Sequence, residues 1–370
     1  MKRQVGDYRQ RRLQKRVSEA RKHAEAGDYQ RAADAYTRIL RDEPDSGIAL
    51  LGLAAVELRQ KNVEAAERLC RRALQQDPKS RVAALVRLGR IAEGRENHEE
   101  ALRCFRLAVE ADPAQVQARV GLARLLSLRE ADEEAEEQLR AALRYNPQSV
   151  ESALLLSSVL SRRERATEAM QLITGMLVKV PDSGRLHLAQ ARLLLGRQEP
   201  QEGIAALRRA LQFAPDNVQI AVLLAQQLVK QEKSALAVET LRSFLERNPD
   251  SKPAKVNLAR ACIERGEYDE ARRLLHELTA GGWFSANVHL LLGEIYWRGR
   301  HVELTMEEYR AVLLGAPQLL TEHPGLAVIN DDSLEIGARV ERFREALGPL
   351  AMGAGSLVEP EATEVSEGGG

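Results

Sequence analysis

The 370-residue sequence has few aromatic side chains, only three cysteines and no excess of either charge. Phe, Trp and Tyr make up 4% of the residues, which predicts a core of alanine and leucine instead of rings. Cys70, Cys104 and Cys262 lack the CxxC spacing of a zinc site or disulfide framework, so we expect small buried hydrophobes. Lys plus Arg equals Asp plus Glu at 54 each, so the chain as a whole has no net charge that would attract nucleic acid or a membrane surface.

Long apolar runs and catalytic motifs are missing as well. No stretch approaches the length of a membrane-spanning helix, and the basic N-terminus has no apolar signal-peptide core, so we expect a soluble, cytoplasmic protein. The seven histidines are scattered, HExxH, GxSxG and GxxxxGK do not occur, and no GxGxxG follows a strand. The sequence therefore predicts no enzyme, no cofactor and no metal site.

The sequence does contain a regular period. Seven of the 13 prolines are spaced at successive gaps of 34, 35, 34, 34, 34 and 34 residues: Pro44, Pro78, Pro113, Pro147, Pro181, Pro215 and Pro249. Proline lacks the amide hydrogen that a helix interior needs, so each one ends a helix. The residue two places later is a good N-cap in all but Gln115: Ser46, Ser80, Ser149, Ser183, Asn217 and Ser251. One helix therefore ends and another begins once per period.

Other positions repeat with the same period. When each proline is numbered 32, position 20 is small and position 24 is larger and apolar, as in Ala101 and Phe105. A spacing of four places both on one helical face, with the small residue where two backbones touch. Positions 7 and 8 hold pairs such as Leu122-Ala123, which mark an earlier helix, and turns such as "GDY" at 27–29 separate the two helices.

This pattern resembles the tetratricopeptide repeat family, a 34-residue helix–turn–helix that carries W-x2-L-G-x2-Y, then A-x3-F, then P. The resemblance covers residues 13–317 as nine tandem units. It implies an all-α solenoid, a right-handed superhelix whose first helices line the concave side. The sequence departs from the family at several points. Among them, the Trp of position 4 is absent throughout, Gly203 replaces Ala, and Trp283 stands where a proline is expected.

The flanking segments differ from the repeats. We expect residues 1–12 to extend the first helix as a basic segment; a contact with lipid, RNA or an acidic protein is the alternative to a solvated helix end. Residues 318–350 include "SLEIGARVERFREALG", which predicts an amphipathic helix that caps the last unit. Residues 351–370 are small, acidic and glycine-rich, and we expect disorder.

A binding groove is predicted from family positions 2, 5, 9, 12 and 13, which face the concave side in similar proteins. Position 9 is arginine in five of nine units, and position 5 is aliphatic in all. An apolar line beside arginines suits an acidic and aliphatic peptide or helix, whereas a solvated face with arginines paired to glutamates is the alternative. The predicted partner-binding residues are Arg90, Arg124, Arg192, Arg260, Val86, Val120, Leu154, Leu188, Val222 and Trp297.

The sequence thus predicts a non-enzymatic adaptor or scaffold that docks a segment of a partner protein. Family members that hold the acidic tails of heat-shock chaperones use Lys at position 5, and the aliphatic residues here argue against that mode. The alternative function is binding of RNA or another nucleic acid, since related helical-repeat proteins read RNA. Zero net charge and the scarcity of aromatic side chains in the groove argue against it.

Overall fold

The computed structural model describes residues 2–281, 283–319 and 323–347, with side chains from residue 11 onward, and the predicted tail at 351–370 lies outside this range. Within the described residues the chain is helical and forms no strand, so the predicted all-α fold of tandem helix pairs is confirmed. The chain divides into two compact units, here called unit 1 (Met1–Pro181) and unit 2 (Asp182–Gly370).

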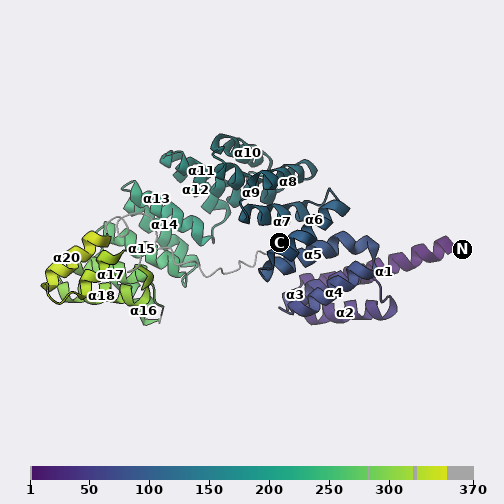
Figure 1. The fold of residues 1–370 in the computed structure, drawn as a ribbon, viewed down its shortest axis with the longest axis horizontal. Coiled ribbons are helices and arrows are strands. Elements are labelled where there is room, and N and C mark those ends of the chain that lie inside the picture. The colour runs from purple at the N-terminus through teal and green to yellow at the C-terminus, as the bar shows by residue number, and fades with distance from the viewer. Residues whose placement is uncertain (1, 282, 320–322, 348–370) are drawn as a thin grey trace. The chain divides into compact units, whose positions relative to one another are not determined.

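Unit 1 contains five helix pairs in its described part, and Figure 1 shows them following one another in chain order. Each pair packs within itself, and its second helix packs on the first helix of the next pair. The pairs are α1 (Lys2–Glu25) with α2 (Tyr29–Asp42), α3 (Gly47–Arg59) with α4 (Val63–Gln76), α5 (Arg81–Gly94) with α6 (His98–Ala111), α7 (Val116–Leu128) with α8 (Asp132–Tyr145), and α9 (Val150–Arg162) with α10 (Ala166–Lys179). A short 3-10 turn, η1 (Pro78–Ser80), precedes α5.

Unit 2 continues the same arrangement over its described residues (Figure 1). The pairs are α11 (Gly184–Gly196) with α12 (Pro200–Phe213), α13 (Val218–Lys230) with α14 (Ser234–Arg247), α15 (Lys252–Glu264) with α16 (Tyr268–Ala280), and α17 (Ala286–Arg298) with α18 (Val302–Gly315). After them come η2 (Pro324–Asn330) and α20 (Ile336–Leu347). Val340, Phe343 and Leu347 of α20 are buried, and the Phe343 ring stacks on Tyr309 of α18 at 4.8 Å between centroids.

The repeated small residue at position 20 is buried in every pair, because it lies where two helices touch. Ala32, Ala66, Ala101, Ala135, Ala169, Ala237 and Ala271 have no exposed surface, and Gly203 is buried. In the last pair the position holds Thr305, which is fully buried and whose hydroxyl donates a hydrogen bond to the His301 carbonyl. The helix backbone thus satisfies the polar group that the packing buries.

Ring side chains at position 24 need an even smaller neighbour. A Cβ added at Gly121 of α7 would lie 2.5 Å from Cζ of Phe105, and one added at Gly52 of α3 would lie 2.3 Å from the Tyr36 ring. In both cases the glycine belongs to the first helix of the following pair. Where a ring fills the space between pairs, glycine allows the next helix to approach.

The N-caps follow the sequence prediction in part. The side chains of Ser149, Ser183 and Asn217 each accept a hydrogen bond from a backbone N–H in the first helical turn. Ser46 and Ser251 make no such bond. Ser80 also makes none, because its hydroxyl donates instead to Asp77 Oδ2 at 2.7 Å.

Candidate functional site

In unit 2 a hollow of about 430 Å³ lies between two first helices, α11 and α13. Arg192 and Leu195 come from α11, and Gln219, Val222, Leu223 and Gln226 come from α13. Two of the predicted groove residues, Arg192 and Val222, therefore share one recessed surface. We call this surface the central hollow. Its mixture of one cation, two amides and three aliphatic side chains offers hydrogen-bond donors, acceptors and apolar contact together.

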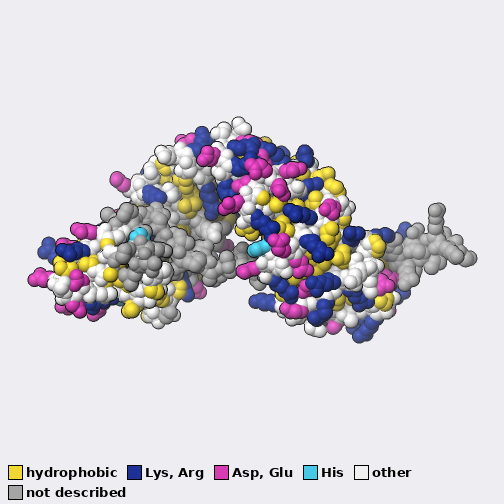
Figure 2. All heavy atoms as spheres, viewed as in Figure 1, with side chains coloured by type: hydrophobic (Ala, Val, Ile, Leu, Met, Phe, Trp, Pro, Cys, Tyr) yellow, Lys and Arg dark blue, Asp and Glu magenta, His cyan; other side chains and the backbone are white. Residues whose placement is uncertain are grey.

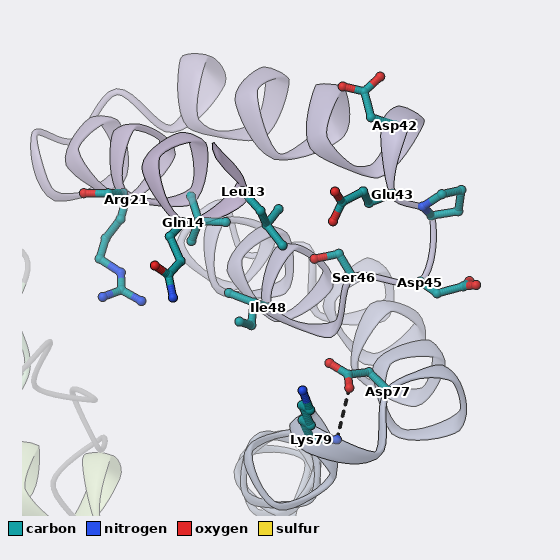
Figure 3. Close-up of a pocket in the computed structure, with 13 residues that line it drawn as sticks. Leu13, Gln14, Arg21, Asp42, Glu43, Asp45, Ser46, Ile48, Asp77 and Lys79 are labelled. Atoms are coloured by element: carbon teal, nitrogen blue, oxygen red, sulfur yellow. Dashed lines mark hydrogen bonds between the residues drawn. The ribbon is translucent and has the colours of Figure 1, made fainter. Parts of the chain in front are cut away.

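In unit 1 a larger hollow of about 770 Å³, here called the N-terminal hollow, lies between α1, the turn after α2, the start of α3 and η1. Its apolar lining includes Leu13, Val17 and Ile48. Figure 3 shows Arg21 and Gln14 at one end of this hollow and the acidic side chains Asp42 and Asp45 at the other. The hollow thus has an apolar middle and ends of opposite character.

The aliphatic residues at position 5 differ in exposure along the chain. Val86 and Val120 in unit 1 are buried, at 4% and 3% exposed. Leu154 in unit 1, and Leu188 and Val222 in unit 2, are half-buried. The buried ones offer almost no surface to a ligand, whereas the half-buried ones do.

Arg124 is already balanced by acidic neighbours. Its Nη1 donates to Glu93 Oε1 at 2.9 Å, and its Nη2 donates to Glu151 Oε1 at 2.7 Å. Glu93 lies on α5 and Glu151 on α9, so one guanidinium links three successive first helices. Glu93 is at repeat position 12 and Glu151 at repeat position 2. A glutamate at either position, next to an arginine at position 9 of the adjacent unit, is the sequence signal for this ion pairing.

The other predicted groove arginines differ from Arg124 in their pairing. In the described part of the chain, Arg90, Arg192 and Arg260 take part in none of the ion pairs. Arg90 and Arg192 are exposed, whereas Arg260 is half-buried. Burial lowers the pKa of Arg260, and the nearby Glu264 opposes that shift. Arg90 and Arg192 are therefore open to an anionic partner in a way that Arg124 is not.

Trp297 lies at the end of the repeats under a cation from α20. The guanidinium carbon of Arg344 is 5.2 Å from the Trp297 ring centroid, and Arg344 Nη1 is 2.6 Å from Glu294 Oε2. The indole is half-buried against the cluster that contains Tyr309 and Val312. Trp297 and Glu294, at positions 12 and 9 of the last pair, therefore contact α20, a role that the sequence did not indicate.

Three residues group closely enough to raise the question of a metal ion. Ligand atoms of Cys262, Glu267 and Glu270 lie within 4.8 Å of one another. Arg242 Nη2, however, is 2.6 Å from Glu270 Oε2 and 3.7 Å from Glu267 Oε2, so a guanidinium already balances the carboxylates. Burial and the two glutamates raise the pKa of Cys262 to about 12, which keeps the thiol protonated. Because Arg242 already pairs with both carboxylates, we assign no metal here.

Charged side chains show no large region of one sign on the face visible in Figure 2, where cationic, acidic and hydrophobic side chains are interspersed over unit 1. Among the described helices, none combines the length and the apolar character needed to cross a membrane. The cytoplasmic location expected from the sequence stays a prediction.

Comparisons with solved structures find helical-repeat proteins of low identity. PilF of Pseudomonas aeruginosa is 20% identical, with a TM-score of 0.47 over 58% of this chain and 97% of the other. PilW, a type IV pilus biogenesis factor, is 18% identical, with a TM-score of 0.49 over 57% and 98%. MamA of Desulfovibrio magneticus RS-1 is 17% identical, with a TM-score of 0.39 over 46% and 97%.

Comparison with curated proteins finds no match. Two family models described as tetratricopeptide repeat do match, one at residues 17–81, 86–139, 133–184 and 188–251 and the other at residues 228–295. These matches span well over half of the chain and coincide with the helix pairs described above. The chain belongs to the tetratricopeptide repeat family.

Proposed function

We propose that this protein is a non-enzymatic scaffold whose first helices bind a peptide or helix of a partner protein. The observation that carries the proposal is the central hollow, where Arg192, Val222 and Gln226 meet on a recessed surface between α11 and α13. A side chain of a partner can enter the hollow while Arg192 pairs with an acidic group and the amides bond to its backbone.

The amide side chains add a second reason to favour a peptide. Gln226 Nε2 donates to Asn257 Oδ1 at 3.1 Å, which links α13 to α15 across the same helix face. Each amide keeps further donor and acceptor capacity. Amides arranged along a face match the alternating carbonyl and N–H groups of an extended peptide backbone.

The experiment is affinity capture with the full chain and with a variant of the central hollow. Arg192→Glu combined with Gln226→Glu removes one positive and adds two negative charges on this surface, so we expect at least tenfold less of a specific partner. Quantitative mass spectrometry of the captured proteins measures the loss. Circular dichroism checks that helicity is unchanged.

A matched control carries the same charge change on a second helix. Arg208→Glu combined with Gln212→Glu alters two exposed residues of α12 at helical spacing. The proposal requires this control to capture the partner as the unmodified chain does. Equal loss of the partner in both variants would contradict peptide binding at the central hollow. Retention of the unmodified chain on an oligonucleotide column, abolished in the hollow variant but not in the control, would favour the nucleic-acid alternative.

A further inference from the structure

The chain as a whole is neutral, but its charges are separated along the sequence. Helix α1 (Lys2–Glu25) carries nine Lys and Arg against three Asp and Glu. Residues 318–370, which contain η2 and α20, carry three Arg against ten Asp and Glu. The other 42 Lys and Arg and the other 41 Asp and Glu lie in residues 26–317. The excess of positive charge therefore belongs to α1, and the excess of negative charge to the segment that includes α20.

Helix α1 presents cations on the side away from the helices on which it packs. Its buried residues Val17 and Ala20 lie in one apolar cluster with residues of α2 and α3. Arg11, Lys15 and Lys22 follow one another at spacings of four and seven, which places them on one side of the helix, opposite that cluster. All three are exposed. We call these three residues the α1 face.

The α1 face is not balanced by acids within the described residues. Arg16 of α1 pairs with Asp42 of α2, whereas none of the described ion pairs involves the α1 face. Arg11 and Lys15 lie one turn apart, so their like charges repel. With 24 residues against 14, α1 is longer than α2 by about 15 Å at 1.5 Å per residue. Figure 1 shows its first turns extending beyond the other helices of unit 1, where a second molecule can approach.

Helix α20 has the same arrangement with the opposite charge. Val340, Phe343 and Leu347 are buried against unit 2. Glu341 and Glu345 lie one turn apart on the other side of the helix, and both are exposed. We call these two glutamates the α20 face. Their like charges repel each other, as the cations of the α1 face do.

Further acids lie close to the α20 face in the sequence. Asp331, Asp332 and Glu335 precede the helix and are exposed. Asp332 pairs with Arg339 at 2.6 Å, but within the described range no ion pair engages Glu335 or the α20 face. Arg342 is the single exposed Lys or Arg among the described side chains of residues 323–347. The outer side of this segment is therefore mainly anionic.

The outer side of α1 is polar where the other first helices are apolar. Position 7 of the repeat holds a buried leucine in units such as those of Leu122 and Leu156. In α1 the same position holds Glu19, which is exposed. A partner that meets this side of α1 must therefore match charges and cannot simply continue the apolar stack of helix pairs.

We propose that the chain associates with itself head to tail, with the α1 face of one copy docked on the α20 face of a second copy. Nucleic acid or an anionic membrane surface would match the α1 face alone, whereas a second copy matches both faces. Because the two faces differ, each copy in a first contact keeps one face free, so association continues into a chain of copies or closes into a ring. No residue of either face lines the N-terminal or the central hollow. Self-association would therefore leave both hollows of every copy available to a partner.

Sedimentation velocity of the full chain at low salt, over a range of protein concentrations, tests the proposal. The unmodified chain should form species larger than a monomer as its concentration rises. Added salt should dissociate them, because charges more than about 10 Å apart are screened at 0.1 M. A chain that stays monomeric at low salt overturns the proposal.

Two variants reverse one face each. Arg11→Glu combined with Lys15→Glu changes the α1 face, and Glu341→Lys combined with Glu345→Lys changes the α20 face. All four residues are exposed, so circular dichroism should show unchanged helicity. Each variant alone should self-associate at least tenfold more weakly than the unmodified chain. An equimolar mixture should associate again, because the intact α20 face of one variant meets the intact α1 face of the other. A mixture that stays dissociated overturns a head-to-tail contact.

A matched control reverses two exposed cations elsewhere in unit 1, Arg68→Glu on α4 with Arg103→Glu on α6. It should self-associate as the unmodified chain does, and an equal loss in the control would show that net charge alone governs association. Nuclease treatment before the measurement should leave the larger species unchanged. Their loss after nuclease would mean that nucleic acid bridges the copies, which overturns the proposal.

Discussion

At the residue scale, the availability of each groove arginine depends on acids from neighbouring first helices. Arg124 and Arg90 occupy the same repeat position, but only Arg124 has Glu93 and Glu151 within hydrogen-bond distance. Arg90 instead has another cation, Arg87, as its neighbour. The repeat position therefore predicts where an arginine lies, and the residues of the adjacent units decide whether it can bind an anion.

Buried thiols give a prediction on the dependence of stability on pH. Burial raises the pKa of Cys70 from 9.0 to about 11, with a further rise from Glu67 against an opposing influence of Arg87. The folded chain therefore holds this proton more tightly than the unfolded chain. The stabilisation is fully present below pH 9 and is lost as the pH rises toward 11.

The measurement compares the unmodified chain with Cys70→Ala by urea unfolding at several alkaline pH values. The stability difference between them should shrink by about 1 kcal/mol for each unit of pH above 9. Titration of lysines and other groups is common to both chains and cancels in the difference. Parallel stability curves across this range would show that the thiol has no raised pKa.

At the element scale, the turn between the two helices of each pair uses one backbone conformation throughout the described repeats. One residue per pair has a positive φ near 60° or 78°: Gly27, Lys61, Glu96, Glu130, Glu164, Gln198, Glu232, Gly266 and Arg300. Only two of these residues are glycine, the residue that adopts this conformation without strain. The other turns therefore retain strain that packing of the helices on either side offsets.

Alanine substitution at two exposed glycines of unit 1 separates this strain from packing. An added Cβ at Gly27 or Gly175 meets nothing within 4 Å, but Gly27 has a φ of 78° and Gly175 lies inside α10. Gly27→Ala should lower the free energy of unfolding by about 1 kcal/mol because of the left-handed backbone. Gly175→Ala should raise it by about 0.8 kcal/mol through helix propensity.

Thermal and urea unfolding of the full chain measure the free energy of unfolding of both variants. The value is taken from the transition of unit 1. The opposite signs make the pair its own control, since each adds one methyl group in open space. A stabilising Gly27→Ala would mean that the turn relaxes to a negative φ without loss of packing.

Sequence reasoning succeeded for the elements because their signals are local. The prolines, the small residue at position 20 and the large residue at position 24 act within one pair or between adjacent pairs, and Ala101 and Phe105 are buried as predicted. The ion pairs were harder, because Arg124 joins residues about 30 positions apart from three separate helices.

At the scale of the whole molecule, the two units present different surfaces on their first helices. Unit 1 has the N-terminal hollow, which Arg21, Lys79, apolar and acidic side chains line, and unit 2 has a single arginine with glutamines in the central hollow. Each unit is a stack in which a pair buries its apolar face on its neighbours, so stability depends on nearest-neighbour contacts. Surface substitutions in one unit should therefore leave the other intact.

The most direct test of the scaffold function is site-specific photo-crosslinking in cells that make the protein. A benzophenone side chain replaces Gln14 in the N-terminal hollow, Gln226 in the central hollow, or the exposed Gln212 on the second helix α12. We expect Gln14 and Gln226 to crosslink to contiguous segments of a partner protein and Gln212 to give only background. Crosslinks from Gln212 alone, or to nucleic acid from the hollows, would contradict the account.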